Sequence, residues 1–251
     1  MVFRIAELEI YESLAAIINL IKFIMNLFER ITHMRKFKLT DIGIGLLFAL
    51  FFISAGVILA VNFRPLYYFD IKHLDIEKTS GIEASVIKEN YDVLIDYNSP
   101  FYKGELKFPT LPSSAPALEH FREVKNIFIA FYYTLAVTAL LLLVIILYKR
   151  KARDYRYLLP SSVTVVVLPL LVALACAINF DKLFVVLHKI FFRNNYWLFD
   201  PATDPIINLL PDTFFMHCLF LILGIILLGS LGLFLLSRVV RKGNDKFRSL
   251  S

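Results

Sequence analysis

Three histidines stand in polar stretches between long apolar runs, and imidazole is the side chain best suited to proton transfer near neutral pH. His120 lies in EHFREVK, and His188 lies in LHKIFFRNNYWLFDPATDP, a segment that also holds a tryptophan and several aspartates and prolines. His73 lies in the charged stretch FDIKHLDIEK, where a solvated ring is the simpler interpretation. The sequence therefore directs attention to His120 and His188.

Each of these two rings also has a purely structural interpretation, in which it donates to a backbone carbonyl near a helix end. For His188 that interpretation is favoured, because at helical spacing it shares a face with Phe184 and Phe192. His120 is followed one turn later by Glu123, which could orient its ring. Two histidines on helices entering different spans suit general acid–base work on a lipid-linked substrate. With Glu123 they could equally bind zinc, since the spacing is not diagnostic.

Motifs of the common enzyme classes are missing from the sequence, which has no glycine-rich phosphate loop, no HExxH and no serine elbow. Adjacent His217 and Cys218 suggest a nucleophilic pair. Neighbours on a helix point about 100° apart, however, so they do not face each other. We expect Cys218 to be a packing residue.

Four segments without ionised side chains are long enough to cross a bilayer as helices. With 58% hydrophobic and 19% charged residues, the chain is too apolar for a soluble domain of this size. We predict an all-α membrane protein with four transmembrane helices at Ile42–Val61, Ile127–Tyr148, Tyr157–Phe180 and Thr213–Ser237.

The net charge of +6 does not indicate a nucleic-acid partner, because the basic residues cluster beside the spans. By the positive-inside rule, both termini and the clusters are cytoplasmic. The loops at 62–125 and 181–212 then form a cap on the outer face, where both candidate histidines lie. The basic clusters are Arg30–Lys38, Lys149–Arg156 and Arg238–Arg248.

The sequence divides into three parts. Residues 1–38 carry a narrow polar stripe on an apolar helix, which predicts an amphipathic helix on the cytoplasmic surface of the membrane. Residues 39–240 form the four-span catalytic domain, and residues 241–251 form a basic cytoplasmic tail. In the first outer loop, Ser80 to Glu83 has capping-box spacing. Pro116 opens a helix that runs into the second span.

The loop around His188 resembles the pattern of the lipoprotein intramolecular transacylase family of bacterial integral membrane proteins. The resemblance covers residues 40–240 and includes EHFREVK as the second histidine motif. Leu187 and Glu123 depart from the family, which has phenylalanine and more usually aspartate at these positions. The matching loop residues are His188, Phe191, Phe192, Asn194, Trp197, Asp200, Pro201, Asp204, Ile207, Leu209, Leu210, Pro211, Phe214 and Phe215.

The resemblance implies an acyltransferase of the cell membrane, in mainly Gram-positive bacteria. It would move the sn-2 acyl chain of a diacylglyceryl-modified lipoprotein to the α-amino group of its N-terminal cysteine, giving the lyso form. In this interpretation the partners are such lipoproteins and membrane lipid, and no cofactor or metal is needed. A zinc-dependent membrane hydrolase and a non-enzymatic lipid-binding accessory protein are the alternatives.

On this interpretation His120 and His188 are the catalytic pair. One takes the proton of the attacking amine, and the other stabilises the oxyanion or protonates the leaving glycerol oxygen. Asn194, Trp197 and Glu123 are the candidate substrate-binding residues. Trp197 and the Asp-Pro turns also anchor and shape the loop.

Overall fold

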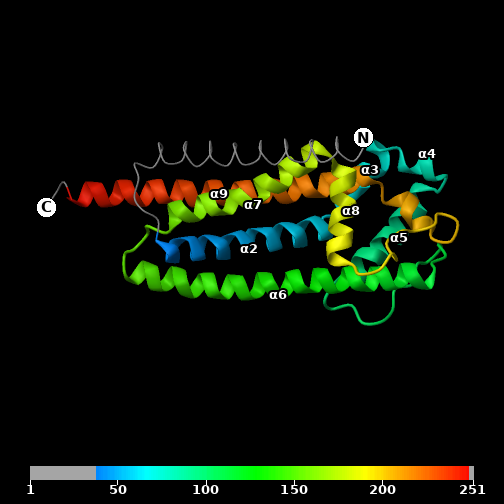
Figure 1. Cartoon of the computed structure of the whole chain (residues 1–251), viewed down its shortest axis with the longest axis horizontal. Helices are drawn as coiled ribbons and strands as arrows, with labels where there is room; N and C mark the ends of the chain where they lie inside the picture. The colour runs from blue at the N-terminus through cyan, green and yellow to red at the C-terminus, as the bar shows by residue number, and fades with distance from the viewer. Residues whose placement is uncertain (1–37, 249–251) are drawn as a thin grey trace, which may run out of the picture.

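Long helices run side by side along the molecule, and the computed structural model has no strand in residues 38–248, the part of the chain that it describes (Figure 1). Three of them are long and apolar enough to cross a membrane. They are α2 (Leu39–Asn62), α6 (Ala115–Lys151) and the Asp212–Lys242 part of α9 (Asp212–Arg248). These three confirm three of the predicted spans by length and composition.

The fourth predicted span corresponds to α7 (Leu158–Ile178), which packs against α2 and α9 in the same bundle. Its 21 residues correspond to about 32 Å of helix, close to the thickness of a hydrocarbon core. Pro169 lies in its interior. The side chains of residues 168, 171–178 and 243–248 are not described, and α7 as a spanning helix stays a prediction.

Helix α2 is the centre of the bundle and packs against α6, α7 and α9. Glycines allow two of these close approaches. A Cβ atom at Gly45 would stand 2.7 Å from the Thr164 Cβ of α7, and one at Gly229 of α9 would stand 2.5 Å from the Phe52 ring. In contrast, α6 packs along α2 but has only sparse contacts with α7 and α9. Large apolar side chains cover its outer face, as expected for a surface that meets lipid: Tyr133, Val137, Leu140, Leu141, Leu143, Val144 and Leu147.

The predicted outer cap is a small helical layer with its own core. After α2, the chain forms α3 (Arg64–His73), α4 (Ile76–Ser80) and α5 (Ala84–Tyr97). The short 3₁₀ helix η1 (Pro205–Leu209) from the second outer loop packs against α4. Tyr67 stacks on Tyr91 at 3.7 Å between ring centroids, and the Tyr67 hydroxyl donates to the Leu209 carbonyl at 2.7 Å. The two outer loops therefore share one core.

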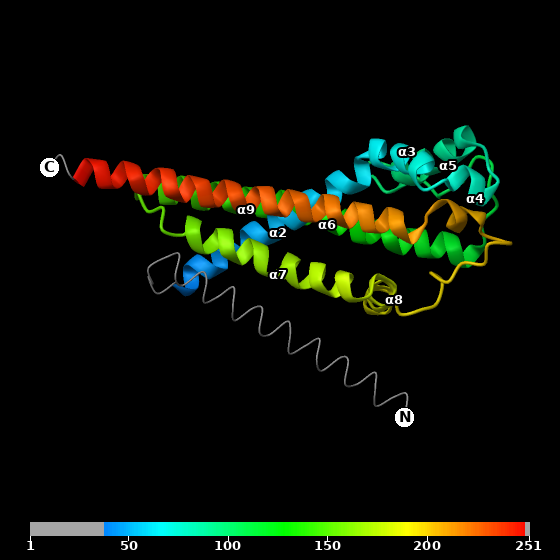
Figure 2. The same ribbon diagram turned by 90° about the horizontal axis from the view of Figure 1, so that it is seen from above.

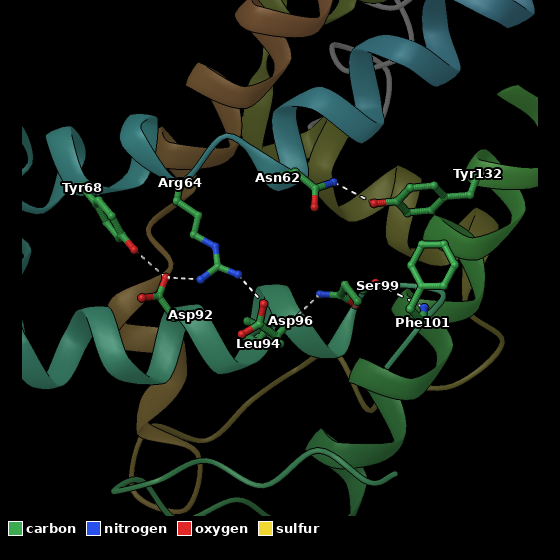
Figure 3. A network of polar contacts seen from close by, with 10 residues as sticks. Asn62, Arg64, Tyr68, Asp92, Leu94, Asp96, Ser99, Phe101 and Tyr132 are labelled. Carbon is green, nitrogen blue, oxygen red and sulfur yellow. Dashed lines mark hydrogen bonds and ion pairs between the residues drawn. The ribbon is translucent and has the colours of Figure 1, made fainter. Parts of the chain in front are cut away.

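Arg64 ties α3 to α5 just beyond the outer end of α2 (Figure 3). Its guanidinium pairs with Asp92 at 3.0 Å and also with Asp96, while the Tyr68 hydroxyl donates to Asp92 at 2.6 Å. Exposed pairs of this kind contribute little singly, but a shared arginine fixes the angle between two helices. The network therefore fixes α3 and α5 to each other within the cap.

Helix α8 (Phe180–Phe191) crosses the bundle at its outer end instead of extending it. Figure 1 shows it running across the other helices, and Figure 2 shows it nearly end-on. The side chain of Asn179 caps it by accepting from the Lys182 N–H at 2.8 Å. Because of this turn, a residue near the end of α8 reaches α6.

Several sequence predictions can be compared with these elements. The capping box at Ser80 was wrong: Ser80 ends α4, its hydroxyl donates to Ile76, and α5 begins at Ala84 without a side-chain cap. The helix opened by Pro116 is confirmed, and the Ser114 hydroxyl caps it by accepting from the Ala117 N–H. The tail predicted from residue 241 continues α9 as helix to Arg248. The predicted helix in residues 1–38 lies outside the described residues, apart from Lys38.

Candidate active site

The rings of His120 and His188 face each other across the interface between α6 and α8. Their centroids are 5.8 Å apart and their planes differ by 32°. His120 lies about two turns before Ile127, where the uncharged part of α6 begins, so it stands just outside the predicted span. The structure thus brings together the two histidines that the sequence singled out, although 68 positions separate them.

His120 is enclosed by aromatic side chains and is 6% exposed. Its ring centroid lies 4.6 Å from that of Phe192 and 5.5 Å from that of Phe199. Burial disfavours the charged ring, and the His188 ring adds a smaller effect in the same direction, so the pKa of His120 falls to about 4. Its Nδ1 atom is buried without a hydrogen-bond partner among the described residues. At neutral pH His120 is therefore an uncharged imidazole.

His188 is held from two sides. Its Nδ1 lies 2.8 Å from the Phe184 carbonyl, which can only accept, so Nδ1 carries the proton and Nε2 has a free lone pair. The Trp197 ring lies 5.0 Å from the His188 ring. Burial lowers the pKa of His188, and the bond to Phe184 and the charge of Asp212 oppose that effect. The bond to a backbone carbonyl that the structural interpretation expects is present, and it leaves Nε2 free.

The loop after α8 is clamped to α6 through Asn194. Its side-chain amide donates to Glu123 Oε1 at 2.8 Å, and its backbone carbonyl accepts from Trp197 Nε1 at 3.1 Å. The Glu123 carboxylate, expected to orient His120, is therefore bonded to Asn194 instead. Packing against the phenylalanines of the loop sets the His120 ring. The role of Trp197 in anchoring the loop agrees with these contacts.

A second link between the two outer loops is Asp204, which is 3% exposed. Its Oδ1 accepts from the Ser114 backbone N–H at 2.6 Å. Its Oδ2 accepts from the hydroxyls of Ser114 at 2.9 Å and Thr203 at 2.8 Å. Ser114 is the N-cap of α6, so Asp204 fixes the start of the helix that carries His120. Sequence reasoning gave this aspartate only a part in shaping a turn.

The other candidate residues lie away from the pair. His73 is exposed and stacks on Phe69, as expected for a solvated ring. Cys218 packs against the core of the cap, as predicted. His217 pairs with Asp70, a fully buried carboxylate on α3, with both oxygens 2.9 Å from His217 Nδ1. No sequence signal could have found that pair, because 147 positions separate its members.

Metal ligands do not gather at the site. Within residues 38–248, no three His, Cys, Asp or Glu side chains lie close enough together to hold a metal ion. A zinc hydrolase that used His120, Glu123 and His188 as ligands therefore has no geometric support. The site can move protons between a buried neutral imidazole and a half-buried imidazole with an oriented lone pair.

The sequence of the chain matches a known protein family. A family model described as "Lipoprotein intramolecular transacylase Lit" matches residues 42–215, which include both histidines and the outer cap. The chain belongs to the lipoprotein intramolecular transacylase family. The resemblance drawn from the two histidine motifs is thereby confirmed, and the chain is an acyltransferase. No curated protein sequence matches it.

Solved structures of a Lit protein share the fold. The membrane-integral Lit from Bacillus cereus is 38% identical, with a TM-score of 0.78 over 82% of this chain and 98% of the other. Two variants of that protein each carry a replaced histidine, and each match covers 82% of this chain and 94% of the other. The arginine variant is 38% identical with a TM-score of 0.74, and the alanine variant is 37% identical with a TM-score of 0.76. Similarity at this coverage shows that the chain is a membrane protein of the Lit fold.

Proposed function

We propose that the chain transfers the sn-2 acyl chain of a diacylglyceryl-modified lipoprotein to the α-amino group of the lipoprotein's own N-terminal cysteine. The product is the lyso-form lipoprotein, with an N-acyl amide and a free glycerol hydroxyl. The observation that carries the proposal is the pair of imidazoles, 5.8 Å apart at one end of a membrane bundle. Family membership supplies the reaction class, and the pair supplies groups that can perform it.

In the proposed topology α2, α6, α7 and α9 cross the membrane with both termini in the cytoplasm. Basic residues flank the bundle at the end opposite to the histidines, including Lys149 to Arg156 between α6 and α7. The active site then faces outward, where the N-terminal amine of a processed lipoprotein is found. Acyl chains would approach from the lipid side, along the face of α6 that carries large exposed apolar side chains.

His188 is the proposed base. Its Nε2 lone pair takes the proton from the amine as the nitrogen attacks the ester carbonyl carbon. An α-amino group with a pKa of about 7.7–8.0 is within reach of an imidazole base. When the C–O bond breaks, the same proton passes from Nε2 to the departing glycerol oxygen. The step therefore forms one amide bond, breaks one ester bond and leaves His188 unchanged.

His120 is the proposed oxyanion donor. Its pKa of about 4 keeps it neutral, so one ring nitrogen carries an N–H that can donate to the tetrahedral oxyanion. Its buried position removes competing water, which strengthens the hydrogen bond. The amine and the ester belong to one molecule, and holding them in register can supply on the order of 7–11 kcal/mol of the barrier. No nucleotide is needed, because an ester is exchanged for a more stable amide.

Glu123, Asn194 and Trp197 are the proposed substrate-side residues. All three take part in the hydrogen bonds and ring contacts that hold the loop after α8 against α6, beside both histidine rings. Substrate would lie against these residues with its glycerol ester between the histidines.

The test is mass spectrometry of the N-terminal peptide of a reporter lipoprotein, in cells that lack other N-acylating enzymes. With the wild-type protein we expect one acyl chain on nitrogen and one ester on the glycerol. His120→Gln and His188→Gln should leave a free amine and both esters, while His73→Gln should behave as the wild type. Unmodified amine with the wild-type protein would refute the reaction, and full conversion by both glutamine variants would remove the pair from the mechanism.

A further inference from the structure

One oxygen of Glu123 has no partner within residues 38–248. Oε1 accepts from the Asn194 amide, but Oε2 is buried and receives no hydrogen bond from the described residues. Burying a carboxylate oxygen without a donor is costly, and native structures keep few such atoms. An unpaired acceptor of this kind can accept from a donor that a bound ligand or a water molecule supplies.

The unpaired oxygen belongs to the same interface as the histidines. Asn194 lies in the loop between Phe192 and Phe199, the two residues that pack on the His120 ring. Glu123 itself lies one helical turn after His120 on α6. The carboxylate head is thus held between α6 and the loop that closes over the pair.

We propose that Glu123 Oε2 is the binding site for the α-ammonium group of the substrate's N-terminal cysteine. This inference rests on the proposed function and specifies how the same site recognises its substrate. An α-amino group is mostly protonated at neutral pH, and an ammonium has three donors and no acceptor. A charge-assisted bond to a buried carboxylate oxygen is among the stronger polar contacts a site can offer.

The consequence is selectivity for a free amine. Once the amine becomes an amide, the nitrogen loses its charge and its charge-assisted hydrogen bond to Glu123, which favours product release. Lipoproteins that already carry an N-acyl chain would be rejected for the same reason. The bound ammonium releases one proton to water, and Glu123 then orients the neutral amine while His188 takes a second proton during the attack and passes it to the glycerol oxygen.

The experiment uses two inert analogues of a diacylglyceryl-cysteine peptide, with ether links in place of both esters. One keeps the α-amine, and the other lacks it, with 3-mercaptopropionyl in place of cysteine. Affinities of both analogues are measured for the full-length protein in detergent micelles. The variant is Glu123→Gln, which preserves shape and places an amide donor where the ammonium would bind. The matched control is Glu119→Gln, which removes a charge from the same helix at a residue bonded to Arg122.

We expect the wild type and Glu119→Gln to prefer the amine analogue by roughly tenfold or more, as for a charge-assisted hydrogen bond. Glu123→Gln should lose the preference and still bind the analogue without the amine. Equal binding of both analogues by the wild type, or an unchanged preference in Glu123→Gln, would overturn the inference. If Glu123→Gln does not fold, the same two affinities are measured for the wild type at about pH 6.5 and about pH 9.5. The preference for the amine analogue must vanish at the higher pH, where the amine is uncharged.

These binding outcomes do not decide the proposed function. That function is tested by mass spectrometry of the N-terminal peptide of the reporter lipoprotein. A wild type that forms the N-acyl product without preferring the amine analogue would refute only the role of Glu123. A wild type that forms no N-acyl product would refute the function itself.

Discussion

The burial of His120 predicts that the protein loses stability as the pH falls below about 6.5, and that one substitution removes much of this loss. Histidine in an unfolded chain titrates near a pKa of about 6.5. In the folded protein, burial and the nearby His188 ring lower the pKa of His120 to about 4. Between these values the unfolded chain binds a proton that the folded chain does not. The free energy of unfolding is therefore highest above pH 6.5, decreases toward pH 4, and levels off below.

The size of the effect follows from the shift. Each pKa unit corresponds to about 1.4 kcal/mol, so His120 alone accounts for about 3 kcal/mol between the two pH limits. The ring is 6% exposed, so solvent screens this contribution little. His188, whose pKa is also lowered by burial, adds to the loss in the same direction.

The assay is unfolding in detergent micelles at about pH 7.5 and about pH 4.5, for the wild type, His120→Gln and His73→Gln. The quantity compared is the difference between the two pH values within each variant, because His120→Gln also changes packing. Between these two pH values the difference should shrink by about 2.5 kcal/mol in His120→Gln and stay at the wild-type value in His73→Gln, whose ring is exposed. If His120→Gln loses as much stability on acidification as the wild type, the ring does not titrate as a buried group, and its role as a neutral donor fails with it.

Further expectations follow from contacts elsewhere in the cap and the loop. Asp204→Ala removes three hydrogen bonds at the start of α6 and should cost about 3 kcal/mol in thermal unfolding, while exposed Asp200→Ala should cost under about 1 kcal/mol. Asp70→Ala leaves His217 without its partner and should lower the melting temperature more than Asp70→Asn, which still offers an acceptor; equal values would contradict a structural pair. Trp197→Phe keeps an aromatic ring beside His188 but loses the bond to Asn194, so acylation of the reporter should slow by roughly tenfold, whereas Trp197→Ala should slow it further.

The spans could be predicted because their signal is local. A run of about 20 residues without a charge can cross a bilayer only as a helix, whatever surrounds it. The start of α6 was equally local, since Pro116 suits the first turn of a helix. In the first outer loop the prediction failed at Ser80, because short polar helices take their ends from packing. There Ser80 ends α4 by donating to the Ile76 carbonyl, and α5 begins at Ala84 without a side-chain cap.

The candidate pair could be found from the sequence because residue type alone restricts proton transfer at neutral pH to few side chains. Its environment could not be found. Asp204 bonds Ser114 across 90 positions, and Asn194 bonds Glu123 across 71. Helical period and motif spacing carry no information at such separations. For this reason the prediction that Glu123 orients the His120 ring was wrong. The sequence shows that the two residues are one helical turn apart, but it does not show that Asn194 of the other loop is the partner of Glu123.

The segment from the end of α8 to the start of α9 is rich in polar residues, and three of them are Asp200, Asp204 and Asp212. Asp200 closes a turn by accepting from the Ala202 N–H, and Asp204 fixes the first turn of α6. Asp212 lies in the first turn of α9, where a negative charge suits the helix dipole, and its field favours protonation of His188. Asp204 and Asp212 therefore act on elements that carry or face a histidine, while Asp200 shapes the turn that leads to Asp204. The two rings lie on separate helices and can stay 5.8 Å apart only if α6 and α8 are both held by the same part of the structure. The loop between α8 and α9 holds both helices. Loss of the Asp204 or the Asp212 carboxylate should accordingly reduce turnover more than it reduces binding, because it disturbs the distance between the rings before it disturbs the surface that holds the substrate.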